Sequence, residues 1–400
     1  MRTLVIADEV PWPRHGGYRI RLEVVVRALA TLGPLDVFSV LHDDREPTEL
    51  SAPPADLPLS RYEVIANRER RSPTTRLLHW ISGHRPRELV WHDDRATRAA
   101  LASWVRPPYD LAWYSQADAY LRFADVVAAP SIVDLIDLRD VVLEHRDRLP
   151  VNGLRGRAAR WADRIDRRRW SRLNRSIAAR VEAVTVCSPL DRSRLGVRNV
   201  HVVPNAYPAP DRPLRRREPT PGGETLLYIG ALGYPPNEDA VRYLVRDVLP
   251  QVRNVLPGVT ARIVGRDASA VSDLRDVRGV EIVGEVDDLR PELKTADLAV
   301  VPIRYGGGTR VKILEAFACR IPVVSTTVGC EGLGVVDGCE VAIADDAVGF
   351  AEACIRVLSD PDLRRSMTDA AHARWEQEFR SEKVEARIVE LVRDVVEDRP

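Results

Sequence analysis

The sequence has 400 residues, which is too long for one typical core and suits two or three domains. Its 59 basic and 59 acidic side chains cancel, so no net charge attracts the protein to nucleic acid. No stretch approaches the roughly 18 consecutive apolar residues that a membrane span needs. The N-terminal MRTLVIADEV lacks the length and cleavage site of a signal peptide, and we expect a cytoplasmic protein.

The cysteines show neither CxxC spacing nor a neighbouring histidine, which does not favour a metal site or a disulfide framework. We expect them to be small buried apolar residues in a reducing compartment. They are Cys187, Cys319, Cys330, Cys339 and Cys354.

Short β-branched runs alternate with longer helical patterns, which is typical of parallel sheets covered on both faces. In the first half, strands are predicted at residues 3–7, 35–40, 111–114, 131–135, 183–187 and 200–203. An amphipathic helix is predicted at residues 19–32, before Gly33-Pro34.

A second series begins near Leu226, with strands at 226–229, 262–264, 280–283, 298–302 and 323–325. Helices are predicted at 237–255, 288–295, 309–319 and 347–358, and further polar-faced helices at 360–396.

A stretch rich in Pro, Gly and Arg, residues 207–223, separates the two series and indicates a linker. The expected organisation is therefore an N-terminal doubly wound domain at 1–206, the linker, and a second doubly wound domain at 224–376. The last residues, 377–400, are expected to form a helix that packs back toward the N-terminal domain. Ligands of such open sheets bind beyond the carboxyl ends of the strands.

The segment from Arg155 to Arg180 carries ten arginines on a helical pattern. One interpretation is a solvated helix whose arginines pair with Asp163 and Asp166. The other is a basic amphipathic face that contacts an anionic membrane. We favour the solvated helix and leave the peripheral membrane contact open.

Three consecutive glycines, Gly306, Gly307 and Gly308, lie between a predicted strand and a predicted helix. Glycines allow a ligand to approach the backbone, and the helix behind them offers unpaired N–H groups at its positive end. Thr309 is expected to be the N-cap. This arrangement favours an anion-binding loop.

Arg310 and Lys312 place two cations in the first turn of that helix, the end at which cations destabilise it. Their placement is explained if an anion binds there, and a diphosphate is the natural candidate. Both residues are therefore candidate catalytic groups, because they would stabilise the charge of a departing diphosphate.

Glu315 lies on a helix that is apolar on nearly every side, so its carboxylate should be buried and in need of partners. Lys312 at i−3 could provide one as a simple intrahelical pair. The functional interpretation, which we favour, is a carboxylate that accepts hydrogen bonds from ribose hydroxyls.

The glycines do not fit other nucleotide-binding motifs. The segment is not GxxxxGK[ST], and the first strand is not followed by GxGxxG. No DxD pair follows a strand, so we expect phosphate binding by backbone and cations, without a metal or another cofactor.

The stretch GGGTRVKILEAFACRIPVVSTTVGCEGL at 306–333 resembles the donor-site motif of the family 4 (group 1) glycosyltransferases, most closely a bacterial group. Further matches are YIGALGYPPNEDA at 228–240, IVGR at 263–266, VGEVDDL at 283–289, VPN at 203–205 and PWPRHGGYR at 11–19. The resemblance is strong over about 224–376 and looser before.

This resemblance implies a GT-B fold, in which two Rossmann-like domains face each other across a cleft. It implies retaining transfer of a sugar from a nucleotide-diphosphate donor, bound by the C-terminal domain, to a hydroxyl acceptor, bound by the N-terminal domain. Glu315 would hold the ribose, Arg310 and Lys312 would face the diphosphate, and Gly16 and Gly17 would admit the donor. The remaining donor-binding residues would be Gly233, Asn237, Gly284, Glu285, Val286, Gly307, Gly308 and Thr309.

Two departures from the family pattern make the sugar preference hard to transfer. Gly307 occupies the position of the first glutamate of the E-x7-E motif. The loop at 231–237 lacks the Arg and Lys that many members carry after the equivalent strand, and Arg310 and Lys312 would replace their charge.

Asp134 and Asp137 follow the fourth N-terminal strand and are further catalytic candidates. They would position the acceptor or stabilise an oxocarbenium ion, or they would cap the next helix. The acceptor itself is open among a glycan, a lipid and a natural product, with residues 60–90 and 137–160 as candidate acceptor regions.

Two other functions share this fold. A sugar-nucleotide epimerase would need additional acid and base groups, and the eight histidines form no cluster in the sequence. An inactive sugar-nucleotide-binding partner is suggested by Gly307, but Arg310, Lys312 and Glu315 together favour a transferase.

Overall fold

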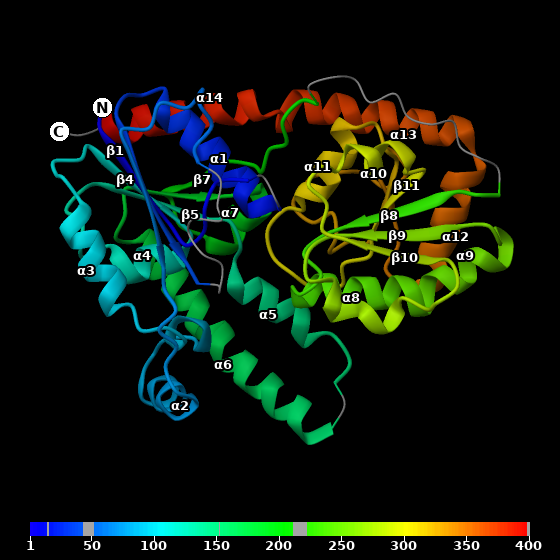
Figure 1. Ribbon diagram of the computed structural model, residues 1–400, viewed down its shortest axis with the longest axis horizontal. Helices are drawn as coiled ribbons and strands as arrows, with labels where there is room; N and C mark the ends of the chain where they lie inside the picture. The colour runs from blue at the N-terminus through cyan, green and yellow to red at the C-terminus, as the bar shows by residue number, and fades with distance from the viewer. Residues whose placement is uncertain (14–15, 43–51, 152, 211–221, 398–400) are drawn as a thin grey trace. The chain divides into compact units, whose positions relative to one another are not determined.

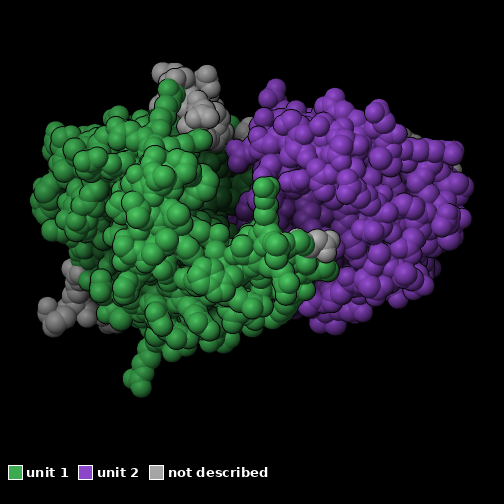
Figure 2. All heavy atoms as spheres, turned by 90° about the horizontal axis from the view of Figure 1, so that it is seen from below, with its two compact units in different colours: residues 1–204, 382–400 green, residues 205–381 purple. Residues whose placement is uncertain are grey.

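The computed structural model describes residues 1–13, 16–42, 52–151, 153–210 and 222–397. The chain forms two compact units, which Figure 2 distinguishes by colour. Unit 1 comprises Met1–Pro204 with Glu382–Pro400, and unit 2 comprises Asn205–Ser381. The chain therefore leaves unit 1 once and returns to it.

Unit 1 is a seven-stranded parallel sheet of order β3-β2-β1-β4-β5-β6-β7 with helices between the strands (Figure 1). Its strands are β1 Thr3–Ala7, β2 Leu35–Leu41, β3 Arg61–Ala66, β4 Leu111–Ser115, β5 Ser131–Leu135, β6 Ala183–Val186 and β7 Val200–Val202. Its helices are α1 Gly17–Ala30, α2 Pro73–Ser82, η2 Arg87–Val90, α3 Arg95–Trp104, α4 Ala117–Phe123, α5 Arg139–Asp147, α6 Gly153–Ala178 and α7 Pro189–Leu195, and α14 Ser381–Glu397 joins them at the end of the chain.

Unit 2 is a six-stranded parallel sheet of order β10-β9-β8-β11-β12-β13. Its strands are β8 Thr225–Ile229, β9 Thr260–Val264, β10 Val280–Gly284, β11 Leu298–Val301, β12 Val323–Ser325 and β13 Ala342–Ile343. Its helices are α8 Pro235–Tyr243, η3 Leu244–Val248, α9 Leu249–Val255, η4 Ala268–Leu274, α10 Arg290–Thr295, α11 Val311–Ala318, α12 Ala347–Ser359, α13 Pro361–Arg374 and η5 Trp375–Phe379.

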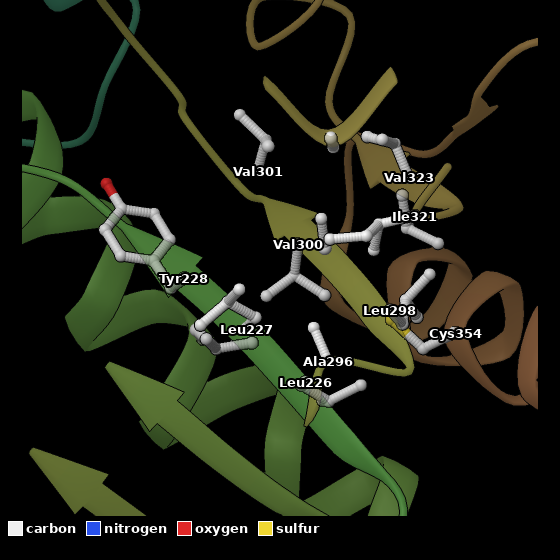
Figure 3. Close-up of a cluster of buried hydrophobic side chains, with 14 of the residues drawn as sticks. Leu226, Leu227, Tyr228, Ala296, Leu298, Val300, Val301, Ile321, Val323 and Cys354 are labelled. Atoms are coloured by element: carbon white, nitrogen blue, oxygen red, sulfur yellow. The ribbon is translucent and has the colours of Figure 1, made fainter. Parts of the chain in front are cut away.

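Each sheet is buried on both faces, as its β-branched strands predict. Every residue of β1, β2 and β4 is buried in unit 1, and every residue of β11 and β12 in unit 2. Figure 3 shows apolar side chains from β8, β11 and β12 packed together, with the hydroxyl of Tyr228 directed away from them. This packing fixes the loops at the carboxyl ends of the strands.

The strand order reverses between β1 and β4 in unit 1 and between β8 and β11 in unit 2. At such a reversal, the two following loops diverge and leave a crevice in which ligands of open α/β sheets bind. The two-sheet α/β fold expected from the sequence is confirmed, and each unit has one such edge.

Two local predictions were wrong, and one strand was not predicted. The helix expected at 237–255 begins at Pro235 and is interrupted by a π-helical turn, η3, because Pro250 cannot donate to the residue four positions earlier. The helix expected at 309–319 begins at Val311, so Arg310, not Thr309, occupies its N-cap position. The strand β3 was not expected; its residues are mostly half-buried and therefore lack a continuous apolar run.

Candidate functional site

The glycine loop of unit 2 follows β11 and has a backbone that only glycine adopts easily. Gly306 has φ +148° and Gly308 has φ +63°. A Cβ atom on Gly306 would lie 2.6 Å from Nη2 of Arg310. The glycines therefore allow the Arg310 guanidinium to lie directly against the loop.

Arg310 bonds to the carbonyl groups of this loop. Its Nη1 donates to the oxygen of Gly307 and, at 2.7 Å, to that of Gly308. Its Nη2 is buried and has no hydrogen-bond partner among the described residues. An unsatisfied buried donor is costly, and this one indicates a site for an acceptor such as a phosphate oxygen.

Lys312 reaches across to the loop that follows β8. Its Nζ donates to the hydroxyl of Tyr228 at 3.0 Å and to Oδ1 of Asn237 at 3.1 Å, and lies 4.2 Å from the centre of the Tyr228 ring. Burial and the charge of Arg310 lower the pKa of Lys312 to about 7, although Glu315 opposes the shift. Lys312 is therefore poised to gain a proton when an anion binds.

Glu315 lies on α11 and is 6% exposed. Its Oε1 accepts a hydrogen bond from the hydroxyl of Tyr207 at 2.6 Å. Burial raises the pKa of Glu315 to about 7, although the hydrogen bond from Tyr207 and the charge of Lys312 oppose the shift. The intrahelical pair with Lys312 does not form as a hydrogen bond, since Lys312 bonds to Tyr228 and Asn237 instead.

Thr309 is held by a residue that precedes the expected linker. Nδ2 of Asn205 donates to the carbonyl oxygen of Thr309 at 3.0 Å and approaches its Oγ1 at 2.9 Å. Thr309 is thus fixed as part of the loop rather than as a helix cap, and the sequence did not single out Asn205 or Tyr207 individually.

Asn237 organises the loop after β8. Its Nδ2 donates to the oxygen of Ala231 at 2.9 Å, while its Oδ1 accepts from the hydroxyl of Tyr228 at 2.8 Å. In the same loop, a Cβ atom on Gly233 would lie 3.0 Å from Cβ of Asp267. The loops after β8 and β11 therefore meet through Asn237 and Lys312 at the point where the strand order reverses.

Gly284, Glu285 and Val286 lie at the end of β10, at the edge of the same sheet. Gly284 has φ +87°, and its carbonyl oxygen accepts from the N–H of Gly265 after β9. Glu285 is exposed and Val286 is half-buried against the core of unit 2. Their place at the carboxyl edge fits a contact with a base, although no polar side chain fixes it.

In unit 1, Gly16 and Gly17 form the start of α1, after β1. Gly16 has φ +100°, is exposed and has open space around the position of a Cβ atom. His15, which precedes them in the quoted motif, lies outside the described residues.

Asp134 lies within β5 and not after it, and it is buried in an ion pair. It accepts from Nε of Arg21 at 2.8 Å, from Nη2 of Arg21 at 2.6 Å and from Oγ1 of Thr185 at 2.6 Å. Its side chain is 1% exposed, so its carboxylate stabilises the fold and is not accessible to an acceptor. Neither aspartate caps the next helix, because α5 has Leu138 at its N-cap position and no side-chain cap. Asp137 is half-buried in the loop between β5 and α5.

Unit 1 has a cavity of about 380 Å³ where its strand order reverses. Polar groups of both signs line it, from the ends of β1, β2 and β4 and from the helices that follow. They are Asp8, Glu9, Tyr18, His42, Glu88, Trp91, His92, Gln116, Asp118, Arg122 and Arg139. The candidate acceptor regions of the sequence contribute only Glu88 and Arg139.

A buried network forms the floor of this cavity. Nη1 of Arg122 donates to Nε2 of His42 at 2.7 Å and to Oδ1 of Asp8 at 3.2 Å. Burial opposes ionisation of Asp8, but Arg122 and His42 together lower its pKa. Burial raises the pKa of Asp118, which therefore retains a proton more readily than an exposed aspartate.

Known proteins resemble parts of the chain in sequence. Residues 223–360 match the family model described as "Glycosyl transferases group 1". Over 194 residues, the chain is 32% identical to glycogen synthase from Mycobacterium tuberculosis (strain ATCC 25618 / H37Rv), which covers 46% of this chain and 46% of that protein. Residues 223–360 therefore resemble the group 1 glycosyltransferases. The chain spans about half the length of the curated relatives that it matches.

Solved structures extend the likeness from residues 223–360 to the whole fold. Sucrose-phosphate synthase from Thermosynechococcus elongatus has a TM-score of 0.71 at 19% identity, with both chains fully covered. HepE from Anabaena in complex with UDP-glucose has a TM-score of 0.64 at 15% identity, covering 98% of this chain and 99% of that chain. These likenesses establish a GT-B fold with two parallel sheets.

No cluster of three metal-ligating side chains occurs in the part of the chain that the structure describes. Among the described helices, none is long and apolar enough to cross a membrane. Three residues that the sequence did not single out, Asn205, Tyr207 and Tyr228, lie within the quoted motifs or beside them. Their roles depend on partners between 84 and 108 positions away in the sequence.

Proposed function

We propose that the protein transfers a sugar, with retention at the anomeric carbon, from a nucleotide-diphosphate donor to a hydroxyl group of a glycan, lipid or natural product. The observation that carries the proposal is the meeting of Arg310, Lys312 and Glu315 at the reversal of strand order in unit 2. Two cations beside a glycine loop suit a diphosphate, and a buried carboxylate one turn further suits the ribose hydroxyls.

The chemistry follows from where charge develops. When the bond from the anomeric carbon to the diphosphate breaks, negative charge grows on the leaving oxygens. The unsatisfied Nη2 of Arg310 and the ammonium of Lys312 would stabilise that charge more in the transition state than in the bound donor. Loss of one such contact is expected to reduce turnover about a hundredfold or more. The proposed site uses side chains and backbone alone and assigns no role to a metal.

Tyr207 and Asn237 would act as positioning residues. Tyr207 holds one oxygen of Glu315, which leaves the other oxygen for the ribose, and Asn237 holds Lys312 at the edge of the sheet. A uridine donor is our first choice, because HepE, which shares this fold, has been solved with UDP-glucose.

For the acceptor, we propose the cavity of unit 1. Its polar groups of both signs suit a ligand rich in hydroxyl groups, and its volume of about 380 Å³ falls within the range of small-molecule sites. Asp118 or Gln116 would orient the reactive hydroxyl, in place of Asp134, whose carboxylate is occupied by Arg21.

The direct test is thermal unfolding of the full chain with UDP-, GDP-, ADP- and TDP-sugars. One nucleotide is expected to stabilise the protein, by about 2.7 kcal/mol at a hundred times its Kd. Glu315→Gln should weaken this effect, whereas Glu352→Gln, at an exposed position of α12, should not.

Incubation with the stabilising donor and a panel of acceptors then distinguishes the functions. A glycosylated product with retained anomeric configuration supports transfer. Interconversion of the donor without an acceptor would identify an epimerase, and binding without turnover an inactive partner. Absence of any nucleotide-dependent stabilisation in the folded protein would contradict the proposed donor site.

A further inference from the structure

Helix α2 of unit 1 presents an apolar face that does not pack against the protein. Leu77, Leu78 and Ile81 are 54%, 66% and 64% exposed. Their spacing of i, i+1 and i+4 places them on one face of the helix. Monomeric proteins rarely expose several large aliphatic side chains together without a binding role.

The helix is nevertheless firmly attached, through its other side. Trp80 is 9% exposed, and its Nε1 donates to Oδ1 of Asp166 on α6 at 2.7 Å. Arg169 of α6 donates to the carbonyl oxygens of Trp80 and Arg85, both at 2.9 Å. Leu77, Leu78 and Ile81 therefore belong to an ordered surface.

Helix α6 lies beside α2 in unit 1 and continues this surface (Figure 1). Its Leu154 and Trp161 are 83% and 62% exposed, and the ring of Trp161 lies 6.3 Å from that of Trp80. Exposed residues recur along α6 at steps of three and four, which is one helical stripe. They are Leu154, Arg157, Trp161, Arg164, Arg168, Arg172 and Arg175.

The acidic residues of α6 do not neutralise this stripe. Asp163 and Asp166 are buried, and both pair with Arg87 at 2.5 Å, so they balance a cation from outside the helix. In the stripe, Arg164 pairs with Asp147 at 3.1 Å. Within α6, Asp166 also lies 4.0 Å from Arg169, whose side chain is 17% exposed. The pairing within the helix that the sequence suggested therefore involves Arg169, which does not belong to the exposed stripe.

We propose that α2 and the exposed stripe of α6, the α2–α6 surface, dock unit 1 on an anionic lipid bilayer. Aliphatic side chains and a tryptophan beside several arginines match the two zones of a membrane surface, the acyl boundary and the acidic headgroups. An acidic protein partner would satisfy the arginines but offers no reason for three exposed aliphatic side chains on α2. The proposal does not depend on the transfer reaction, because docking is measured without donor or acceptor.

The test is co-sedimentation of the full-length protein with vesicles, one set of pure phosphatidylcholine and one in which about a third of the lipid is phosphatidylglycerol. We expect binding to the anionic vesicles, weakened by salt. The triple variant Leu77→Ser, Leu78→Ser, Ile81→Ser should lose at least about tenfold in partition coefficient. The triple variant Arg157→Gln, Arg168→Gln, Arg172→Gln should lose roughly fivefold for each arginine removed.

Matched controls lie on unit 2. Val255, Val336 and Val348 are 60%, 59% and 54% exposed, and their replacement by serine should leave binding unchanged. Arg275→Gln, Arg278→Gln and Arg356→Gln remove the same charge from exposed positions outside the surface. Thermal unfolding and nucleotide binding should be unaltered in all four variants, which separates lost docking from lost folding and from failure of the proposed donor site.

Three results would overturn the proposal. One is the absence of binding to anionic vesicles at low salt. Another is equal loss of binding in the unit 2 arginine variant, which would assign the effect to total charge. The third is a dimer, measured by light scattering, that the α2 variant dissociates while the vesicle partition stays the same, which would identify a second copy of the chain as the occupant.

Discussion

Lys312 and Glu315 are a lysine and a glutamate with pKa values near 7, and burial is the largest cause of both shifts. Each group therefore changes its charge close to neutral pH, and a donor bound at the proposed site would shift the two pKa values in opposite directions. A diphosphate favours the ammonium form of Lys312, whereas ribose hydroxyls that donate hydrogen bonds favour the carboxylate form of Glu315. Donor binding should thus be linked to protons.

The sign of the linkage depends on pH. At about pH 8.5, free Lys312 is mostly neutral because its pKa is about 7, and Glu315 is ionised both with and without the donor. Binding of a nucleoside diphosphate should therefore take up protons. Isothermal titration in two buffers of different ionisation enthalpy measures this uptake.

Lys312→Arg is the matched variant, because arginine remains charged throughout this range. It should abolish the uptake at about pH 8.5 and leave the release expected near pH 6, where Glu315 is partly protonated in the free protein. Unchanged proton uptake in this variant would show that Lys312 does not contact the anion.

The site was only partly predictable from the sequence at this scale. The glycine loop, Arg310, Lys312 and Glu315 lie in one continuous stretch, so their proximity followed from the chain itself. The partners of Lys312 did not: Tyr228 and Asn237 are 84 and 75 residues away, while the partner expected at i+3 is not bonded to it. Long-range partners depend on strand order, which a single sequence does not specify.

At the scale of elements, the Arg21–Asp134 pair joins α1 to β5. Arg21 also donates to the carbonyl oxygens of Val203 and Pro204, at 2.9 and 3.2 Å, where unit 1 is about to end. Burial lowers the pKa of Arg21, but Asp134 outweighs this and raises it above the usual value. One buried guanidinium thus connects a helix, a strand and the exit of the chain.

Breaking this pair should be costly. Arg21→Met leaves Asp134 buried without its counter-charge, and we expect a loss of about 3–5 kcal/mol in the free energy of unfolding. Urea denaturation measures the loss. The double variant Arg21→Met, Asp134→Leu should recover most of it, because no unpaired charge remains.

A surface pair provides the comparison. Arg365 and Asp362 are 74% and 92% exposed, and Arg365→Met should cost less than about 1 kcal/mol. Equal losses in the two single variants would contradict a special role of the buried pair, and failure of the double variant to recover would indicate that Asp134 has a further function.

Periodicity predicted most elements, and the exceptions have physical reasons. Strands buried on both faces, such as β1 and β11, are nearly continuous apolar runs and were placed correctly. β3 lies at the edge of its sheet, and Arg61 and Glu63 interrupt its first half, so only its last three residues form an apolar run. The π-helical turn at Leu244–Val248 responds to Pro250, whose effect on a helix depends on the packing around it.

At the scale of the molecule, each unit has its own apolar core, one built on each sheet. We therefore expect two unfolding transitions in calorimetry rather than one. A stabilising nucleotide should raise the transition of unit 2 first, because Arg310, Lys312 and Glu315 all belong to that unit.

Gly265→Ala identifies the transition. The residue has φ +150°, and a Cβ atom would lie 1.7 Å from the carbonyl oxygen of Gly230. The substitution should lower the midpoint of the nucleotide-sensitive transition and leave the other in place. A single transition shifted by both perturbations would show that the units unfold together.

The two ends of unit 2 meet. The N–H of Tyr207 donates to the oxygen of Phe379 at 2.9 Å, Tyr207 pairs with Arg380, and Nε1 of Trp375 donates to the oxygen of Tyr207 at 3.1 Å. Residues 205–381 therefore form one continuous segment whose two ends lie side by side. A gene fusion with one junction before residue 205 and one after residue 381 can replace the whole segment. Since the proposed donor site lies within these residues, their exchange among relatives is expected to change the donor and to leave the cavity of unit 1 unaltered.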